Sequence, residues 1–132
     1  MSETHQLTEL QIAVMRVLWD RGEASVADIW EALLPERGLA QTTVATLLSR
    51  LEKRGVVAHD TRSRQYFYRA TISESDVRKD MVRELTDRLF DGDVAALMSH
   101  LLSAREVSAG DLARMRKLVE AHETGGKVNH GN

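Results

Sequence analysis

The sequence contains no cysteine and a single proline among its 132 residues. Without cysteine the chain can form no disulfide, thiolate zinc site, iron–sulfur cluster or cysteine nucleophile. Aromatic residues make up only 5% of the chain, so we expect a helix-rich fold with an aliphatic core. No run of apolar residues is long enough to span a bilayer, and the first residues show no signal-peptide pattern. We therefore expect a soluble, cytoplasmic protein.

The composition that remains is typical of a folded protein, with 42% hydrophobic and 29% charged residues. The length allows one ordinary domain or two small ones. The 18 lysines and arginines are outnumbered by 20 acidic residues, and the formal net charge is −2. Such a total speaks against nucleic-acid binding unless the positive charge is concentrated in one part of the chain.

Two amphipathic helices are predicted near the N-terminus. Thr8 and Gln11 have the spacing of a capping box, in which each side chain bonds a backbone N–H at the start of a helix. Ser25 and Asp28 repeat this spacing at the start of the second helix. We expect Pro35 to end that helix, because its ring disfavours helical geometry at the preceding residue.

Residues 41–55 predict a third helix whose two faces differ in chemistry. An apolar face carries Val44, Leu47, Leu48 and Leu51. The opposite face has short hydroxyl side chains and cations but few acids, whereas an ordinary solvent-exposed helix face mixes Glu with Lys. We therefore predict that this face binds DNA, through Thr42, Thr43, Thr46, Ser49, Arg50 and Lys53.

After the third helix the pattern changes from helical to extended. Residues 56–59 and 65–69 are rich in strand-forming residues, and the basic segment 60–64 is expected to join them as a hairpin tip. Three helices followed by a hairpin is the order of a winged helix-turn-helix. Arg62 and Arg64 in the tip suit contacts to phosphates or the minor groove.

The positive charge is concentrated in this part of the chain. Residues 1–49 carry a net charge of −4, residues 50–69 carry +4, and residues 70–132 carry −2. The basic segment contains the end of the third helix and the hairpin, which a winged helix presents to the major groove and the flanking phosphates. Arg50 is long enough for a bidentate contact to guanine or for a phosphate.

Three further helices are predicted after the hairpin, beginning at Ser73, Asp93 and Ser108. Three short helices make a poor core by themselves, so we expect their apolar stripes to pack against a second copy of the chain. The expected dimerisation residues are Val77, Met81, Leu85, Leu89, Leu97, Met98, Leu101, Leu112, Met115, Leu118 and Val119.

The predicted fold class is therefore mainly α (α+β). We expect a winged-helix DNA-binding domain over residues 1–72, with a two-stranded β-wing. A three-helix dimerisation module should follow over residues 73–123. The Gly- and Asn-rich residues 124–132 are expected to form a flexible tail.

Several segments resemble the BlaI/MecI penicillinase-repressor family. They include residues 7–19, residues 42–55 with the Thr-Val-x-Thr-Leu-Leu-x-Arg-Leu core from Thr43 to Leu51, Arg64-Gln65-Tyr66-Phe67-Tyr68 in the hairpin, and Ser73-Glu74-Ser75-Asp76 after it. The resemblance covers about residues 7–122. One departure is Ser63, which stands where the family usually has glycine before the wing arginine.

The resemblance implies a homodimeric repressor that binds an inverted-repeat operator in double-stranded DNA. Family members often control β-lactam resistance genes together with a membrane metalloprotease sensor, and cleavage in the dimerisation region releases the DNA. The bond cut in the best-known members is Asn-Phe, and the corresponding place here is His100-Leu101. That departure puts the same cleavage rule in question.

Other functions are weighed against this one. The hydroxyl-rich face could be an ordinary solvated helix surface, and a winged helix could serve as a protein–protein adaptor whose basic face binds an acidic partner. The five histidines are scattered without the spacing of metal ligands. No catalytic motif is recognised either, so we expect no enzyme activity, no metal and no cofactor.

Overall fold

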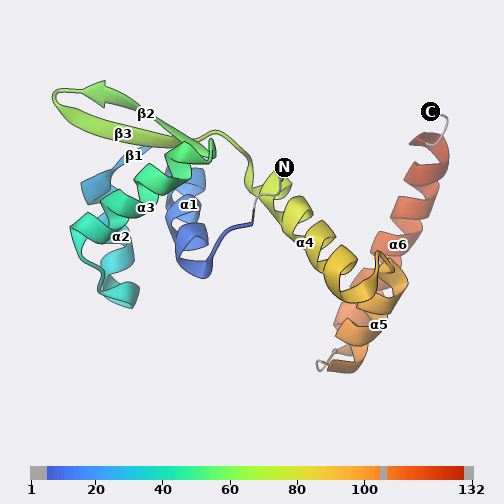
Figure 1. Cartoon of the computed structure of the whole chain (residues 1–132). Coiled ribbons are helices and arrows are strands. Elements are labelled where there is room, and N and C mark those ends of the chain that lie inside the picture. The colour runs from blue at the N-terminus through green and yellow to red at the C-terminus, as the bar shows by residue number, and fades with distance from the viewer. Residues whose placement is uncertain (1–5, 105–106, 130–132) are drawn as a thin grey trace. The chain divides into compact units, whose positions relative to one another are not determined.

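The computed structural model describes residues 6–104 and 107–129 and shows a mainly helical chain with one small sheet (Figure 1). The chain divides into two compact units, an N-terminal unit up to Leu85 and a C-terminal unit from Thr86 onward. The elements in chain order are α1 (Glu9–Arg21), β1 (Ala24–Ser25), α2 (Val26–Arg37), α3 (Gln41–Lys53), β2 (Val57–Arg62), β3 (Gln65–Ala70), α4 (Glu74–Phe90), α5 (Val94–Ala104) and α6 (Ala109–Asn129).

Both predicted capping boxes are confirmed at the starts of α1 and α2. The Gln11 amide donates to Thr8 Oγ1 at 3.1 Å, and the Thr8 amide donates to Gln11 Oε1 at 3.0 Å. Ser25 and Asp28 make the same reciprocal pair at 3.1 and 3.2 Å. Each box satisfies two amides that have no partner inside the helix.

The expectation that Pro35 ends the second helix is wrong. α2 passes through Pro35 and reaches Arg37. Proline removes one N–H donor, but its fixed φ is compatible with helix, and here only Glu36 and Arg37 follow it within α2. The helix ends at Gly38, which has a left-handed φ of 60° and donates its N–H to Leu34 O at 3.0 Å.

The sheet has three antiparallel strands in the order β1-β3-β2. The sequence predicted β2 and β3 but not β1, whose two residues are too few for a periodic pattern. Arg62 pairs with Gln65 across the hairpin end, so the loop is two residues long rather than the expected segment 60–64. Both loop residues have positive φ, 51° at Ser63 and 65° at Arg64, as two-residue hairpins of type I′ require.

The N-terminal unit encloses a continuous apolar core. Its fully buried side chains include Met15, Leu18, Ile29 and Leu48. Val77 of α4 is also buried in this core, and Met81 packs against it. Both were expected in the dimer interface, and the first domain was expected to end at residue 72. The structure places the start of α4 against the core of its own chain, so Val77 has no free surface for a partner, whereas Met81 is only partly buried.

The C-terminal unit has much less interior. Among its described residues, Leu97 is the hydrophobic side chain that is buried. α6 continues to Asn129, although a flexible tail was expected from residue 124; glycine weakens a helix by about 1 kcal/mol but does not prevent it. Residues 130–132 of the expected tail lie outside the described residues.

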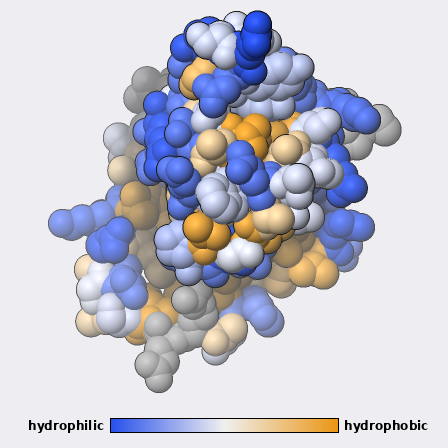
Figure 2. Space-filling view, turned by 90° about the vertical axis from the view of Figure 1, so that its left-hand side faces the viewer, coloured by the Kyte–Doolittle hydropathy of each residue, from blue (hydrophilic) through white to orange (hydrophobic). Residues whose placement is uncertain are grey.

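The surface shown in Figure 2 is mostly hydrophilic, with hydrophobic residues gathered in limited patches. Some exposed apolar surface is normal in any folded protein. Of the helices in the described part of the chain, none combines the length and apolar character needed to cross a membrane.

Candidate nucleic-acid interface

α3 carries the predicted polar face on the surface of the N-terminal unit. Its apolar residues Val44, Leu47, Leu48 and Leu51 are buried in the core. Burial of this stripe determines the rotation of the helix about its axis, so that the opposite stripe must face outward. Every predicted contact residue on α3 is exposed, namely Thr42, Thr43, Thr46, Ser49, Arg50 and Lys53.

The start of α3 differs from the starts of α1 and α2. Its N-cap is Ala40, which offers no side-chain hydrogen bond, and its first turn contains no acid. Helices α1 and α2 have capping boxes and an acid in the first turn. The amides and positive dipole end of α3 are therefore not neutralised by its own side chains, which favours an anion such as phosphate nearby.

The connection between α2 and α3 holds the start of α3 in place. The Trp30 indole Nε1 donates to Leu39 O at 2.7 Å. Gly38, the residue before Leu39, has the left-handed backbone conformation that turns the chain after α2. These two features fix the entry into α3, so the direction of the helix is set by contacts within the domain.

At the other end of α3 the chain turns sharply into the wing. The Val56 amide donates to Leu51 O at 3.1 Å, and Gly55 has a φ of 82°. The neighbouring Arg54 donates from Nη2 to Gln6 O at 2.7 Å. This hydrogen bond ties the end of α3 to the segment before α1, so Arg54 has a structural role. This tight ending places the wing next to the last turn of α3.

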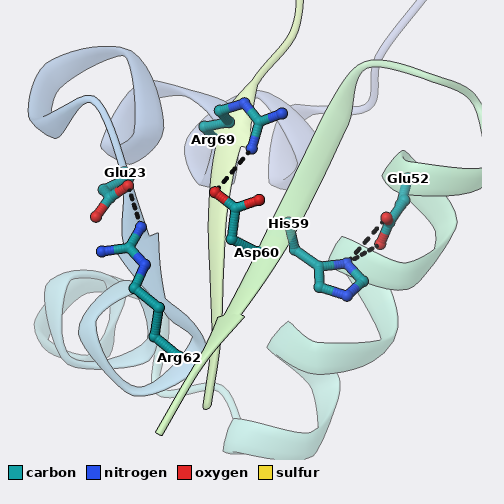
Figure 3. Close-up of polar contacts among 6 residues, drawn as sticks. All are labelled: Glu23, Glu52, His59, Asp60, Arg62 and Arg69. Carbon is teal, nitrogen blue, oxygen red and sulfur yellow. Dashed lines mark hydrogen bonds and ion pairs between the residues drawn. The ribbon is translucent and has the colours of Figure 1, made fainter. Parts of the chain in front are cut away.

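One face of the wing carries aromatic rings, and His59 on this face is hydrogen-bonded to Glu52 of α3 (Figure 3). His59 Nδ1 lies 2.8 and 2.9 Å from the two carboxylate oxygens of Glu52 on α3, and the nitrogen donates because a carboxylate can only accept. The His59 ring stacks on Tyr66 with centroids 3.9 Å apart. Burial, followed by the charge of Glu52, raises the pKa of Tyr68 on the same face.

The other face of the wing carries paired charges (Figure 3). Arg62 Nη2 lies 2.6 Å from Glu23 Oε1, in the turn between α1 and β1. The Arg62 guanidinium carbon also lies 4.6 Å from the centroid of the Phe67 ring. Arg69 and Asp60 pair at 3.3 Å on the same side. The Arg62 hydrogen bond lowers the pKa of the Glu23 carboxyl, and Glu23 raises the pKa of Arg62.

The two faces follow from strand periodicity, since successive side chains point to opposite sides of a sheet. His59 is paired in register with Tyr68, whereas Asp60 is paired with Phe67. The sequence indicated the strands but not the partner of Arg62. Glu23 lies 39 positions away from Arg62 in the chain, and no local pattern joins them.

These pairs show how the positive charge of residues 50–69 is distributed. Arg54 bonds a backbone carbonyl, and Arg62 and Arg69 pair with acids. Within the described part of the chain, Arg50, Lys53 and Arg64 are the cations of this segment that have neither an ion pair nor a side-chain hydrogen bond. The structure therefore leaves three cations available, two on α3 and one at the wing tip.

Exposed apolar side chains characterise α5, α6 and the end of α4. Leu89 is 68% exposed and Leu118 is 67% exposed. Of the other expected dimerisation residues, Leu85, Met98, Leu101, Leu112 and Val119 are exposed, Met115 is partly covered, and Leu97 is buried.

His100 and Leu101, the expected cleavage region, are both exposed within α5. The His100 ring lies 5.9 Å from the Phe90 ring, centroid to centroid. Among the described residues, no group of three or more His, Cys, Asp or Glu side chains is placed to hold a metal ion.

Comparison with known proteins gives a consistent match. The profile of the penicillinase repressor family matches residues 7–121. The chain is 22% identical over 123 residues to the penicillinase repressor of Bacillus licheniformis, covering 93% of this chain and 96% of the relative. It is 25% identical over 118 residues to an uncharacterised 16.5 kDa protein of Latilactobacillus sakei, covering 89% of this chain and 81% of that protein.

A solved structure supports the fold of the N-terminal unit. The solution structure of the DNA-binding domain of the repressor BlaI superposes with a TM-score of 0.51 at 28% identity. The match covers 58% of this chain and 93% of that domain. The winged-helix expectation is thereby confirmed.

Proposed function

The chain belongs to the penicillinase repressor family, and on that premise we propose that it is a homodimeric transcriptional repressor that binds an inverted-repeat operator in duplex DNA. Family membership together with the winged-helix fold supports the broader statement that it is a DNA-binding transcriptional repressor. The finer statements rest on the geometry described above.

The observation that carries this proposal is the outer face of α3. Hydroxyl side chains and two unpaired cations cover it, and its N-terminal end has neither a side-chain cap nor an acid. Hydroxyls and arginine can read base edges, and the helix end can face a phosphate. In the proposed complex α3 enters the major groove, with Arg50 and Thr46 at base edges and Lys53 at the backbone.

The exposed apolar residues of the C-terminal unit support the homodimer. Several large hydrophobic side chains there are 40% to 68% exposed, and such surfaces usually mark an interface. Covering them with the same surface of a second copy forms a two-fold symmetric pair. Two DNA-reading helices related by that symmetry would match an inverted repeat, with half-sites one helical turn or a multiple apart.

Release from DNA is proposed to follow the family pattern. Cleavage by a membrane metalloprotease sensor near His100–Leu101 would remove α6 from the dimer surface and thereby weaken operator binding. Exposure of both residues supports access by a protease. Control of β-lactam resistance or a related stress-response operon is part of the same proposal.

The alternative is a winged-helix adaptor that binds an acidic protein. A basic edge and unpaired cations are compatible with it, but the hydroxyl-rich helix face favours DNA, because base edges and phosphates are hydrogen-bonding surfaces. Dependence on DNA sequence separates the two functions.

The test is selection of bound duplexes from a random-sequence pool with the full chain. We expect an inverted repeat to be enriched and bound with a steep salt dependence. Arg50→Ala should weaken binding to the selected duplex by about 1–3 kcal/mol, while Lys79→Ala, an exposed cation of α4, should leave it unchanged. Enrichment of no sequence would reject the repressor and favour the adaptor.

A further inference from the structure

The wing carries two arginines that lie two positions apart in the chain but differ in their contacts. Arg62 ends β2, and its guanidinium is held between the Glu23 carboxylate at 2.6 Å and the face of the Phe67 ring. Arg64 is exposed in the two-residue loop and has no ion pair or side-chain hydrogen bond among the described residues. Sequence patterns predict that both arginines contact DNA, whereas within the described part of the structure only Arg62 is held by contacts within the domain.

The contacts of Arg62 link the wing to the body of the N-terminal unit. Glu23 lies between α1 and β1, while Arg62 lies close to the end of the hairpin (Figure 3). Glu23 is 44% exposed and Arg62 is 50% exposed, so both groups remain close to solvent. Toward a phosphate backbone the pair is electrically neutral, since the acid cancels the cation beside it.

We propose that Glu23 is a positioning residue that keeps Arg62 on the body of the domain, so that Arg64 is the wing cation that contacts DNA. This inference rests on the proposed DNA-binding function. Arg62 then braces the wing through Glu23 and Phe67 and neutralises no phosphate. Glu23 thereby limits the electrostatic part of DNA affinity, which is the part that does not depend on sequence.

The charge arithmetic of the pair makes the proposal measurable. Each phosphate neutralised by a protein cation changes the slope of log affinity against log salt concentration by roughly −0.9 on duplex DNA. Replacing both Glu23 and Arg62 by Gln removes the pair without changing the net charge. Replacing Glu23 alone releases Arg62 and adds one free cation beside the DNA.

The experiment measures this slope for the full chain on two probes, a duplex selected from a random pool and a scrambled duplex of the same length. The variants are Glu23→Gln, the double variant Glu23→Gln with Arg62→Gln, and Arg64→Gln. Thermal unfolding of each variant, compared with the wild type, shows that the domain remains folded.

We expect the double variant to have the wild-type slope, because Arg62 neutralises no phosphate in the wild type. Arg64→Gln should reduce the magnitude of the slope by about 0.9 for each bound subunit. Glu23→Gln should bind both probes more tightly and increase the magnitude of the slope by up to the same amount.

A double variant whose slope loses about 0.9 per subunit would overturn the inference, since Arg62 would then be a phosphate contact in the wild type. An unchanged slope in Glu23→Gln would also overturn it. The proposed function itself fails if the wild type binds neither probe, or binds the selected and the scrambled duplex equally, and both results are distinguishable from a changed or unchanged salt slope in the variants.

Discussion

The two units of this chain differ in how far they bury their apolar side chains. In the N-terminal unit, leucine, valine, isoleucine and methionine side chains from three helices, the sheet and the start of α4 form one buried core. In the C-terminal unit, residues of the same kinds remain on the surface, and Leu89 and Leu118 are about two-thirds exposed. Composition alone does not distinguish the units, but burial does.

The difference shows which unit is complete as a monomer. The N-terminal unit has capping boxes on α1 and α2 and a continuous buried core, so its stability comes from its own packing. The C-terminal unit has hydrophobic residues in helical stripes, and among its described residues Leu97 is the hydrophobic side chain that its interior buries. Its stability therefore depends on a second surface, which we propose is another copy of the same unit.

The difference between the two units is tested most directly by placing charged residues among the exposed apolar side chains of the C-terminal unit. Leu89→Asp with Leu118→Asp should convert the proposed dimer to a monomer and lower affinity for the selected duplex by about 10²–10⁴-fold, because bivalent binding is lost. Sedimentation and DNA titration measure the two effects. Leu34→Asp, at a half-exposed leucine of α2, is the matched control and should remain dimeric. A dimeric double variant would place the interface elsewhere.

A cavity in the N-terminal core tests whether that unit is stabilised by its own packing. Leu48→Ala, at a fully buried position of α3, should lower the free energy of unfolding by about 2–5 kcal/mol. Leu48 has no exposed surface, so the loss should not depend on protein concentration. Urea unfolding followed by circular dichroism measures it. A concentration-dependent loss would mean that the N-terminal unit is not complete by itself.

The hairpin loop offers a smaller test, within the N-terminal unit only. Ser63 has a φ of 51°, a conformation that costs most L-residues about 1–2 kcal/mol. Ser63→Val should lower the free energy of unfolding by about that amount, because a β-branched residue tolerates it worst. Ser63→Asn should be neutral or stabilising. Equal effects of Val and Asn in thermal unfolding would contradict the loop geometry.

The smallest expected effect is the pH dependence of the Glu23–Arg62 pair. The pKa of Glu23 is lowered below its ordinary value of 4.5 by the Arg62 hydrogen bond, so the pair stabilises the folded state above that pH and loses this contribution as the pH falls. The stability difference between wild type and Glu23→Gln should therefore shrink toward zero in acid.

Glu120→Gln is the control for this measurement, at an exposed acid of α6 in the C-terminal unit. Its stability difference from the wild type should not show the same fall. A wild type that remains more stable than Glu23→Gln by the same margin at low pH would show that the pair does not act through ionisation of Glu23.

Much of the fold could be predicted because its signals are local. The capping boxes at Thr8 and Ser25 join residues three positions apart, and the apolar stripe of α3 repeats over a few turns. The exposed face of α3 was predictable for the same reason: a helix whose buried face is known has a known exposed face. The contact roles of the α3 residues stay predictions.

The features that sequence reasoning missed depend on contacts between distant segments. β1 is a strand only because Ala24 and Ser25 pair with β3. Val77 follows the same helical spacing as residues on the exposed stripe, yet it is buried because α4 begins against the N-terminal core. Arg62 could not be distinguished from Arg64 until the fold placed Glu23 beside it.

The two tryptophans provide the protein with built-in optical probes. Trp30 donates from its indole N–H to Leu39 O at the entry to α3, and Trp19 donates to Ile72 O just before α4. Indole fluorescence responds to loss of such a hydrogen bond and to water. In a Trp30→Phe protein the emission reports on the start of α4, and in a Trp19→Phe protein on the start of α3. Local loosening at these two joints can therefore be followed separately, without an added label.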